Sequence, residues 1–266
     1  MWRPVMSDYS RFDHPAIASF LFYPRPEETR SLSGDNISEL TIPVEPDITI
    51  GGKIFIAGKK NPSILFFHGN GEIVIDYDDL GPLYVNLGIN FIPVDYRGYG
   101  RSGGNPSVSS MMKDCHAIFD YMLQWLKDNG FQGKLIIMGR SLGSASALEL
   151  ASTRQNVIDG LIIDSGFAYA IPLLRILGID PDRLGLHEEE GFRNSYKIKQ
   201  FRKPTLIIHA EKDHIIPYSD GLTLYDSSPA EHKHMVTIKE ANHNTIFMYG
   251  LKEYLTAVRQ LADEIE

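Results

Sequence analysis

Short apolar runs alternate along this chain with longer stretches that have the apolar spacing of helices. Four of the runs, ILFF, LIIM, LIID and TLIIH, are apolar almost throughout, which is typical of strands covered on both faces. Strands that alternate with helices form a mostly parallel sheet with helices on both faces, so we predict an α/β fold. The expected strands are residues 38–44, 48–57, 63–67, 90–95, 134–138, 160–164, 205–209 and 234–238. The expected helices are about 77–87, 109–129, 141–153, 217–225 and 245–265.

The first two predicted strands differ from the others because only a short turn separates them. Residues 38–44 and 48–57 are therefore expected to form an antiparallel hairpin at the edge of the sheet. For the chain as a whole we predict an N-terminal extension over residues 1–36 that packs on the core. Residues 37–266 are expected to form a single α/β domain.

One segment of that domain interrupts the alternation. Residues 167–202 contain Pro172, a helical fragment (PLLRILGI) and the acidic run HEEE at 187–190. In open α/β sheets the ligand site lies at the carboxyl ends of the strands, where such an insertion would overhang it. We interpret residues 167–202 as a small lid.

Composition and charge exclude several classes of protein. The chain has 266 residues, 43% of them apolar, which is enough for a sizeable core. Its net charge is −8 and it has no cluster of Lys and Arg, which argues against nucleic-acid binding. The apolar run at residues 16–23 is far shorter than the roughly 20 residues of a membrane span. The single cysteine, Cys115, suits a reducing compartment, so we expect a soluble cytoplasmic protein.

The segment GRSLGS, residues 139–144, follows a predicted strand and begins a helix rich in small residues. A nucleophilic serine on a sharp strand-to-helix turn needs glycines around it, because β-carbons at those positions would collide with the neighbouring strand and helix. The helix start also brings backbone N–H groups and a partial positive charge close to Ser141. An ordinary turn is the alternative, but the strand before and the small residues after favour a nucleophile.

A serine nucleophile needs a base, and six histidines follow Ser141 in the chain. His243 lies in the loop ANHNT, after the last predicted strand and before the last helix, from which its ring can reach over the sheet. In enzymes with this turn the chain order is nucleophile, acid and histidine. We therefore predict His243 as the base. The other five are His187, His209, His214, His232 and His234.

An acidic residue should orient the imidazole and stabilise its charged form. Asp213 is favoured because it follows the strand TLIIH, at a carboxyl end. Asp164 ends the preceding strand and is an alternative, although capping the following turn explains it equally well. Glu211 is a weaker third candidate.

Two hydrogen-bond donors are required for the oxyanion that develops in acyl transfer. One is expected to be the backbone N–H of Leu142, the residue after the nucleophile. The loop FFHGNGE, residues 66–72, follows the third predicted strand, and its glycines allow an N–H to turn inward. Asn70 is the best-placed second donor.

Together these motifs resemble the α/β-hydrolase superfamily, with the single-domain esterase, lipase and serine-aminopeptidase-like hydrolases as the nearest branch. The motifs are HGNG (68–71), DYRGYGRSGG (95–104), GRSLGS (139–144), EKDHIIP and ANHN. The resemblance implies an α/β-hydrolase fold, in which a mostly parallel eight-stranded sheet is flanked by helices and carries a small lid. It also implies a triad of Ser141, His243 and Asp213, with the Leu142 and Asn70 amides as an oxyanion hole. Asn242 stands where the family often has glycine.

The predicted function is hydrolysis of a carboxylic ester, thioester or amide through an acyl-enzyme. A catalytically silent binding protein, or an acyltransferase or perhydrolase with the same triad, are the alternatives. Membrane-anchored relatives carry a hydrophobic or cysteine-rich N-terminal segment that this sequence lacks, which argues against a protein depalmitoylase. No metal or cofactor is predicted, and no oligomeric state is assigned. The apolar lid favours a small-molecule substrate with a hydrophobic acyl group, contacted by Phe167, Leu173, Leu174 and Leu177.

Overall fold

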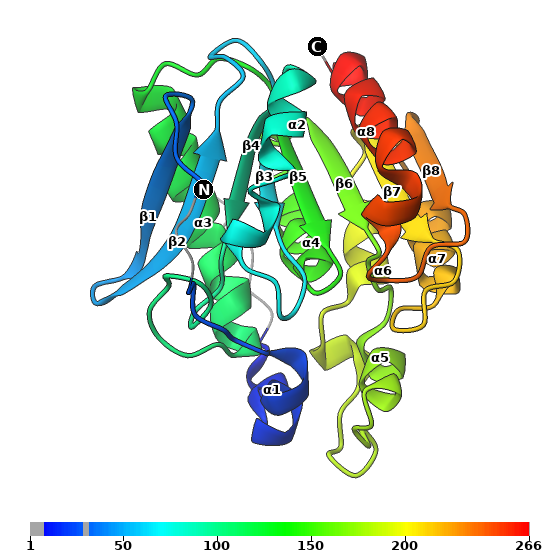
Figure 1. Cartoon of the computed structure of the whole chain (residues 1–266). Helices are drawn as coiled ribbons and strands as arrows, with labels where there is room; N and C mark the ends of the chain where they lie inside the picture. The colour runs from blue at the N-terminus through cyan, green and yellow to red at the C-terminus, as the bar shows by residue number, and fades with distance from the viewer. Residues whose placement is uncertain (1–7, 29–31, 266) are drawn as a thin grey trace.

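Eight strands form one open sheet in the computed structural model, which describes residues 8–28 and 32–265 (Figure 1). The strand order across the sheet is β1-β2-β4-β3-β5-β6-β7-β8. β1 pairs antiparallel with β2 and β2 antiparallel with β4, whereas all the other pairs are parallel. The predicted α/β-hydrolase fold is thus confirmed. The strands are β1 Ile37–Glu45, β2 Ile48–Phe55, β3 Ser63–Phe67, β4 Asn90–Val94, β5 Leu135–Arg140, β6 Gly160–Asp164, β7 Thr205–Ala210 and β8 Lys233–Ile238.

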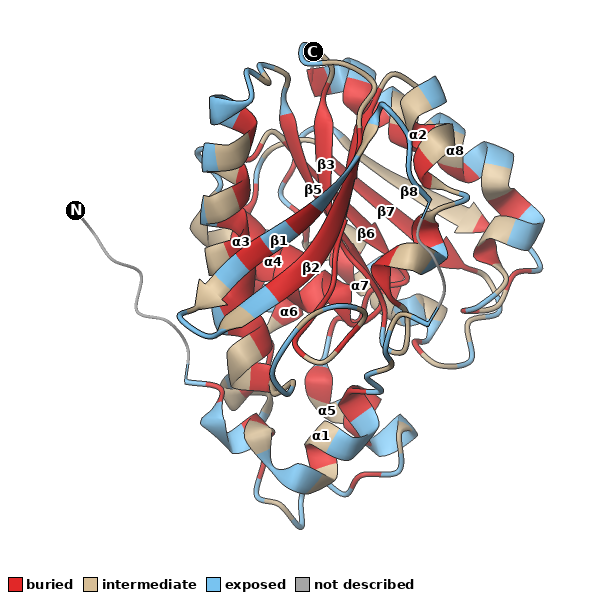
Figure 2. Ribbon diagram, turned by 60° about the vertical axis from the view of Figure 1, so that its left-hand side comes forward, coloured by how far each residue is buried: buried red, intermediate tan, exposed pale blue. Residues whose placement is uncertain are grey.

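Helices cover both faces of the sheet, which explains the apolar character of its central strands. Every residue of β3, β4, β5, β6 and β7 is buried. α3 (Val108–Asp128), α4 (Gly143–Thr153) and α7 (Tyr218–Ser227) pack on one face. α2 (Gly81–Asn86) and α8 (Ile246–Ile265) pack on the other. Figure 2 shows the buried strands between these two layers.

The helix predicted over residues 77–87 is shorter in the structure. A 3₁₀ turn, η2 (Val74–Tyr77), is followed by α2, which begins only at Gly81. Pro82 has no N–H to donate to an earlier carbonyl, so a helix cannot run through it from 77 and starts beside it instead. A β-carbon at Gly81 would overlap the ring of Phe55, so glycine also lets α2 approach the sheet closely.

The N-terminal region and the predicted lid meet beyond the carboxyl ends of the strands. The first comprises η1 (Ser10–Asp13) and α1 (Pro15–Leu21); residues 1–7 and 29–31 of the predicted extension lie outside the described residues. The second comprises α5 Ala170–Ile176, η3 Glu188–Glu190, α6 Asn194–Lys197 and η4 Ile198–Gln200. α1 and α5 lie at the same end of the molecule (Figure 1). No helix among the described residues combines the length and apolarity needed to cross a bilayer.

Candidate active site

Ser141 lies in the sharp turn between β5 and α4. Its φ of +50° is in the left-handed region, which a residue with a β-carbon adopts only under strain. A β-carbon at Gly139 would overlap the carbonyl of Gly143, and one at Gly143 would overlap the carbonyl of Phe67. Both glycines are therefore required for the helix to start this close to the sheet, and the turn projects the Ser141 side chain beyond the strand end.

His243 and Asp213 meet Ser141 at this point. The Ser141 hydroxyl lies 2.9 Å from Nε2 of His243, and Nδ1 of His243 lies 2.7 Å from Oδ2 of Asp213. A carboxylate can only accept, so Nδ1 carries the proton and Nε2 is free to accept the proton of the serine hydroxyl. All three side chains are buried or nearly so. The arrangement can move a proton from the hydroxyl to the imidazole.

The surroundings of Asp213 keep it ionised. Burial by itself raises the pKa of this carboxyl, but the hydrogen bond from His243 and those from the amides of Ile216 and Ile215 outweigh it and hold the pKa below its ordinary value. His209 also lies near this carboxylate, with its Nε2 3.6 Å from Oδ2. Burial lowers the pKa of His209, so that ring is neutral and adds no competing charge.

The two other acidic candidates lie elsewhere. Asp164 accepts hydrogen bonds from Arg140, Ser165 and Tyr254, and none from His243. Glu211 is near the surface, where its carboxylate pairs with Lys239. Asp213 is the candidate that the fold brings to the histidine.

Leu142 and Asn70 line the same cavity as Ser141. Leu142 stands at the start of α4, and Asn70 lies in the loop after β3. Within the described part of the chain, neither backbone N–H has a hydrogen-bond partner. Two unengaged donors beside a serine hydroxyl can stabilise an oxyanion.

The Asn70 loop is held from two sides. The side-chain carbonyl of Asn70 accepts from the Tyr23 amide at 2.7 Å and from the Tyr99 hydroxyl at 2.8 Å. The Gly69 amide donates to Glu72 at 2.6 Å. The loop is therefore tied to the N-terminal region as well as to its own turn.

A small apolar cavity of about 60 Å³ opens beside Ser141. Of the residues predicted to contact substrate, Leu173 and Leu177 line it. Phe167 and Leu174 do not line it, so these two expected contacts are not found at this cavity. Phe167 packs edge-on against Phe192. Neighbouring residues of a helix point in different directions, so Leu174 of α5 faces inward where Leu173 faces the cavity.

Four further cavity residues were missed by the sequence analysis. Phe20 and Leu21 come from α1, and Ile215 and Ile216 come from the loop after β7. The apolar run at residues 16–23 was a signal for the first two, but its spacing does not reveal where the helix docks.

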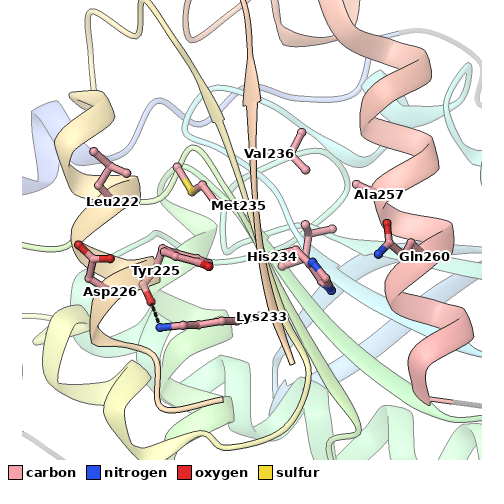
Figure 3. Close-up of a pocket in the computed structure, with 10 residues that line it drawn as sticks. Leu222, Tyr225, Asp226, Lys233, His234, Met235, Val236, Ala257 and Gln260 are labelled. Carbon is pink, nitrogen blue, oxygen red and sulfur yellow. Dashed lines mark hydrogen bonds between the residues drawn. The ribbon is translucent and has the colours of Figure 1, made fainter. Parts of the chain in front are cut away.

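A larger cavity, of about 460 Å³, lies at the amino-terminal half of β8 (Figure 3). Figure 3 shows Leu222 and Tyr225 on one side of the strand and Ala257 and Gln260 on the other. The cavity at β8 contains none of the predicted site residues. This end of the strands is opposite to the edge that carries Ser141.

The chain and its fold are similar to those of several known proteins. The profile of the family described as serine aminopeptidase, S33, matches residues 58–176. Alpha/beta hydrolase domain-containing protein 17B of Homo sapiens is 27% identical over 268 residues, which cover 96% of this chain and 78% of the human protein. The Xenopus laevis protein of that name is 30% identical over 210 residues, which cover 74% of this chain and 65% of the relative.

Among solved structures, the esterase Pf2001 of Pyrococcus furiosus superposes with a TM-score of 0.73 at 16% identity, covering 91% of this chain and 99% of the esterase. Est1E of Butyrivibrio proteoclasticus, solved with ferulic acid bound, has a TM-score of 0.70 at 18% identity, with coverages of 85% and 98%. The order of the strands, the turn at Ser141 and these matches lead to one assignment: the chain belongs to the α/β-hydrolase superfamily.

Proposed function

We propose that this protein is a serine hydrolase that cleaves a carboxylic ester through an acyl-enzyme intermediate. The observation that carries the proposal is the continuous hydrogen-bonded line from the Ser141 hydroxyl through both ring nitrogens of His243 to Asp213, with distances of 2.9 and 2.7 Å. A serine hydroxyl is a weak nucleophile until a base accepts its proton, and this line supplies that base.

In the proposed reaction, Ser141 Oγ attacks the ester carbonyl while its proton passes to Nε2 of His243. The Leu142 and Asn70 amides donate to the resulting oxyanion. The intermediate collapses as His243 returns the proton to the leaving alcohol. A water then attacks the acyl-enzyme with His243 again as base, and the acid and free Ser141 are released.

Asp213 has a supporting role in this scheme. Its carboxylate fixes the His243 tautomer that leaves Nε2 bare, and its negative charge stabilises the imidazolium that forms in both steps. The two backbone N–H bonds to its other oxygen hold the carboxylate in that orientation.

The cavity lining supports a substrate with an apolar acyl group. Leucine, isoleucine and phenylalanine side chains surround Ser141, and an acyl chain gains free energy by leaving water for such a surface. Two proteins of similar structure, the esterase Pf2001 and the monoacylglycerol lipase of Paleococcus ferrophilus, support an ester as the substrate.

A fluorophosphonate probe combined with p-nitrophenyl esters from acetate to palmitate tests the proposal. We expect labelling of the wild type, none of Ser141→Ala, and turnover that rises beyond acetate. An unlabelled native protein would favour a binding function instead. Activity confined to acetate would contradict the apolar acyl group while leaving the hydrolase assignment intact.

A further inference from the structure

Arg140, the residue before Ser141, has a buried guanidinium that binds three separate parts of the site. Its Nε donates to Oε1 of Glu72 at 3.0 Å, Nη1 to Oδ2 of Asp164 at 2.9 Å, and Nη2 to the backbone carbonyl of His243 at 2.7 Å. The side chain is only 4% exposed. None of the steps in the proposed reaction uses it.

The bond to the His243 carbonyl ties down the loop that carries the imidazole. That loop joins β8 to α8, and Phe247 in the first turn of α8 lies against the guanidinium, with its ring centre 5.6 Å from Cζ. Ser141 and Arg140 are adjacent in the chain, so this bond links the backbone of the base directly to the strand end that carries the nucleophile.

The bond to Glu72 extends the same link to the oxyanion loop. While Oε1 of Glu72 faces Arg140, Oε2 accepts from the Gly69 amide and from the Tyr77 hydroxyl, each at 2.6 Å. Gly69 precedes Asn70, whose amide is the proposed second oxyanion donor. The guanidinium therefore lies between the two loops that must face Ser141.

Asp164 is the remaining hydrogen-bond acceptor of the Arg140 guanidinium. It holds Nη1 from the end of β6 and is itself bound by the Tyr254 hydroxyl at 3.2 Å. Burial raises the pKa of Glu72, but the charge of Arg140, with the Tyr77 hydroxyl, overcomes this and lowers it to about 2. The Glu72 carboxylate is thus ionised beside the guanidinium.

We propose that Arg140 is a positioning residue for the hydrolysis proposed above, holding the His243 loop and the Asn70 loop in fixed register around Ser141. The planar fork of arginine offers donors in several fixed directions, which three acceptors on different elements require. Lysine keeps the charge but cannot reproduce that geometry. Since the proposal rests on the proposed function, its test includes a measurement that does not depend on turnover.

The first test is Arg140→Lys, compared with Arg97→Lys. Arg97 is also buried and paired, with its Nε and Nη2 at 2.6 and 2.7 Å from Asp114, but it makes no bond to the site. We expect Arg140→Lys to lower kcat about 30-fold with KM within about two-fold, because misplacing a reacting group by a fraction of an ångström slows the chemical step. Arg97→Lys should leave both constants within about two-fold of the wild type.

The second measurement is the low-field proton NMR signal of the His243 Nδ1–H, assigned by its loss in His243→Ala. We expect this signal to shift or broaden in Arg140→Lys and to stay unchanged in Arg97→Lys. If the wild type neither labels nor hydrolyses, the proposed function fails, whereas this signal still reports on Arg140. A folded Arg140→Lys with wild-type kcat and an unmoved signal would overturn the positioning proposal.

Glu72→Gln provides a test if Arg140→Lys does not fold. Glutamine has one accepting oxygen, so it can keep Arg140 or the Gly69 amide as a partner but not both. We expect about a 10-fold fall in kcat with KM nearly constant. An unchanged kcat in this variant would refute the link to the oxyanion loop.

Discussion

The carboxyl edge of the sheet and the outer edge at β8 each hold a histidine 2.7 Å from a carboxylate. At the first, Nδ1 of His243 faces Asp213; at the second, Nε2 of His234 faces Glu264. The first pair is 8% and 0% exposed, the second 41% and 23%. The cavity beside His234 is also several times larger than the one beside Ser141.

The two hydrogen-bond distances are equal and the larger cavity lies beside His234, so the functional difference lies in what else each ring touches. The second ring nitrogen of His243 meets a serine hydroxyl held in a strained turn. The His243 and Asp213 side chains are almost fully buried, so their hydrogen bond is stronger than it would be at the surface. Among the described residues no serine hydroxyl is hydrogen-bonded to the ring of His234, so we interpret the β8 pair as an exposed surface contact.

A third pair, His116 with Glu149, shows that a histidine and a carboxylate can be buried together without forming a catalytic site. Nε2 of His116 lies 3.2 Å from Glu149, whose other oxygen contacts Lys197 at 2.7 Å and the Tyr9 hydroxyl at 3.0 Å. The network joins α3, α4, α6 and the segment before η1. It is as buried as the site at Ser141, yet no serine hydroxyl in the described part of the chain is hydrogen-bonded to the ring of His116, so we assign it to stability alone.

The largest effect is expected from removing the base or the nucleophile. Ser141→Ala and His243→Ala should each lower kcat on the order of 10⁴- to 10⁶-fold, and the double variant should lose no more than the worse single one, because the two act as one unit. Initial-rate kinetics on the best p-nitrophenyl ester measure this. A loss below ten-fold for His243→Ala would remove the distinction from His234.

Asp213→Asn should have the next largest effect. An amide can donate to Nδ1 and so favour the tautomer that blocks Nε2, which lowers kcat by about 10⁴-fold. Glu264→Gln changes the corresponding carboxylate of the surface pair and serves as the matched control, with unchanged kcat. If both variants retained activity, the orienting role of Asp213 would be untenable.

Glu149→Gln should affect stability rather than catalysis. It leaves buried Lys197 without its carboxylate, which costs about 3 kcal/mol of unfolding free energy at pH 7. Burial raises the pKa of Glu149, but His116 and Lys197 together lower it from 4.5 to about 2. The wild type therefore has this stabilisation in full above pH 4.5 and loses it as the pH falls toward 2.

Urea unfolding at two pH values checks this sign. The gap between wild type and Glu149→Gln should be about 1 kcal/mol smaller at pH 3.5 than at pH 7. Turnover of the folded variant should stay within about two-fold of the wild type. A large fall in kcat without loss of stability would show that this buried pair serves the chemistry after all.

The smallest effect is expected from His234→Ala. An exposed ion pair contributes roughly 0 to 1 kcal/mol, and salt screens it. Unfolding free energies of the two proteins at low and high salt should differ by no more than this, with the difference smaller at high salt. Reduced ester hydrolysis by His234→Ala would indicate that the β8 cavity contributes to catalysis, which the exposure of His234 argues against.

Much of this architecture could be predicted from local patterns. The β5 run ends in GRSLGS, and steric demands at Gly139 and Gly143 are local enough to be anticipated from the chain itself. His243 and Asp213 were expected because each follows a strand, and carboxyl ends of parallel strands meet at one edge. The helix predicted over residues 77–87 was placed too early in the chain, because a helix cannot run through Pro82 and α2 begins only at Gly81.

The cavity and the internal supports could not be predicted in this way. Phe20 of α1 and Leu177 beyond α5 are 157 positions apart by their numbers, and nothing in either segment encodes their meeting. The same holds for Arg140, to which the sequence analysis assigned no role. Its three acceptors come from three other elements.

The sequence alone determined the alternation of strands and helices and the placing of a serine, an acid and a histidine after three strands, because these depend on apolar periodicity and on short-range sterics. The tertiary structure decided which acid reaches the ring, which side chains line the cavity and what holds the loops, because those contacts join residues that only the packed core brings together.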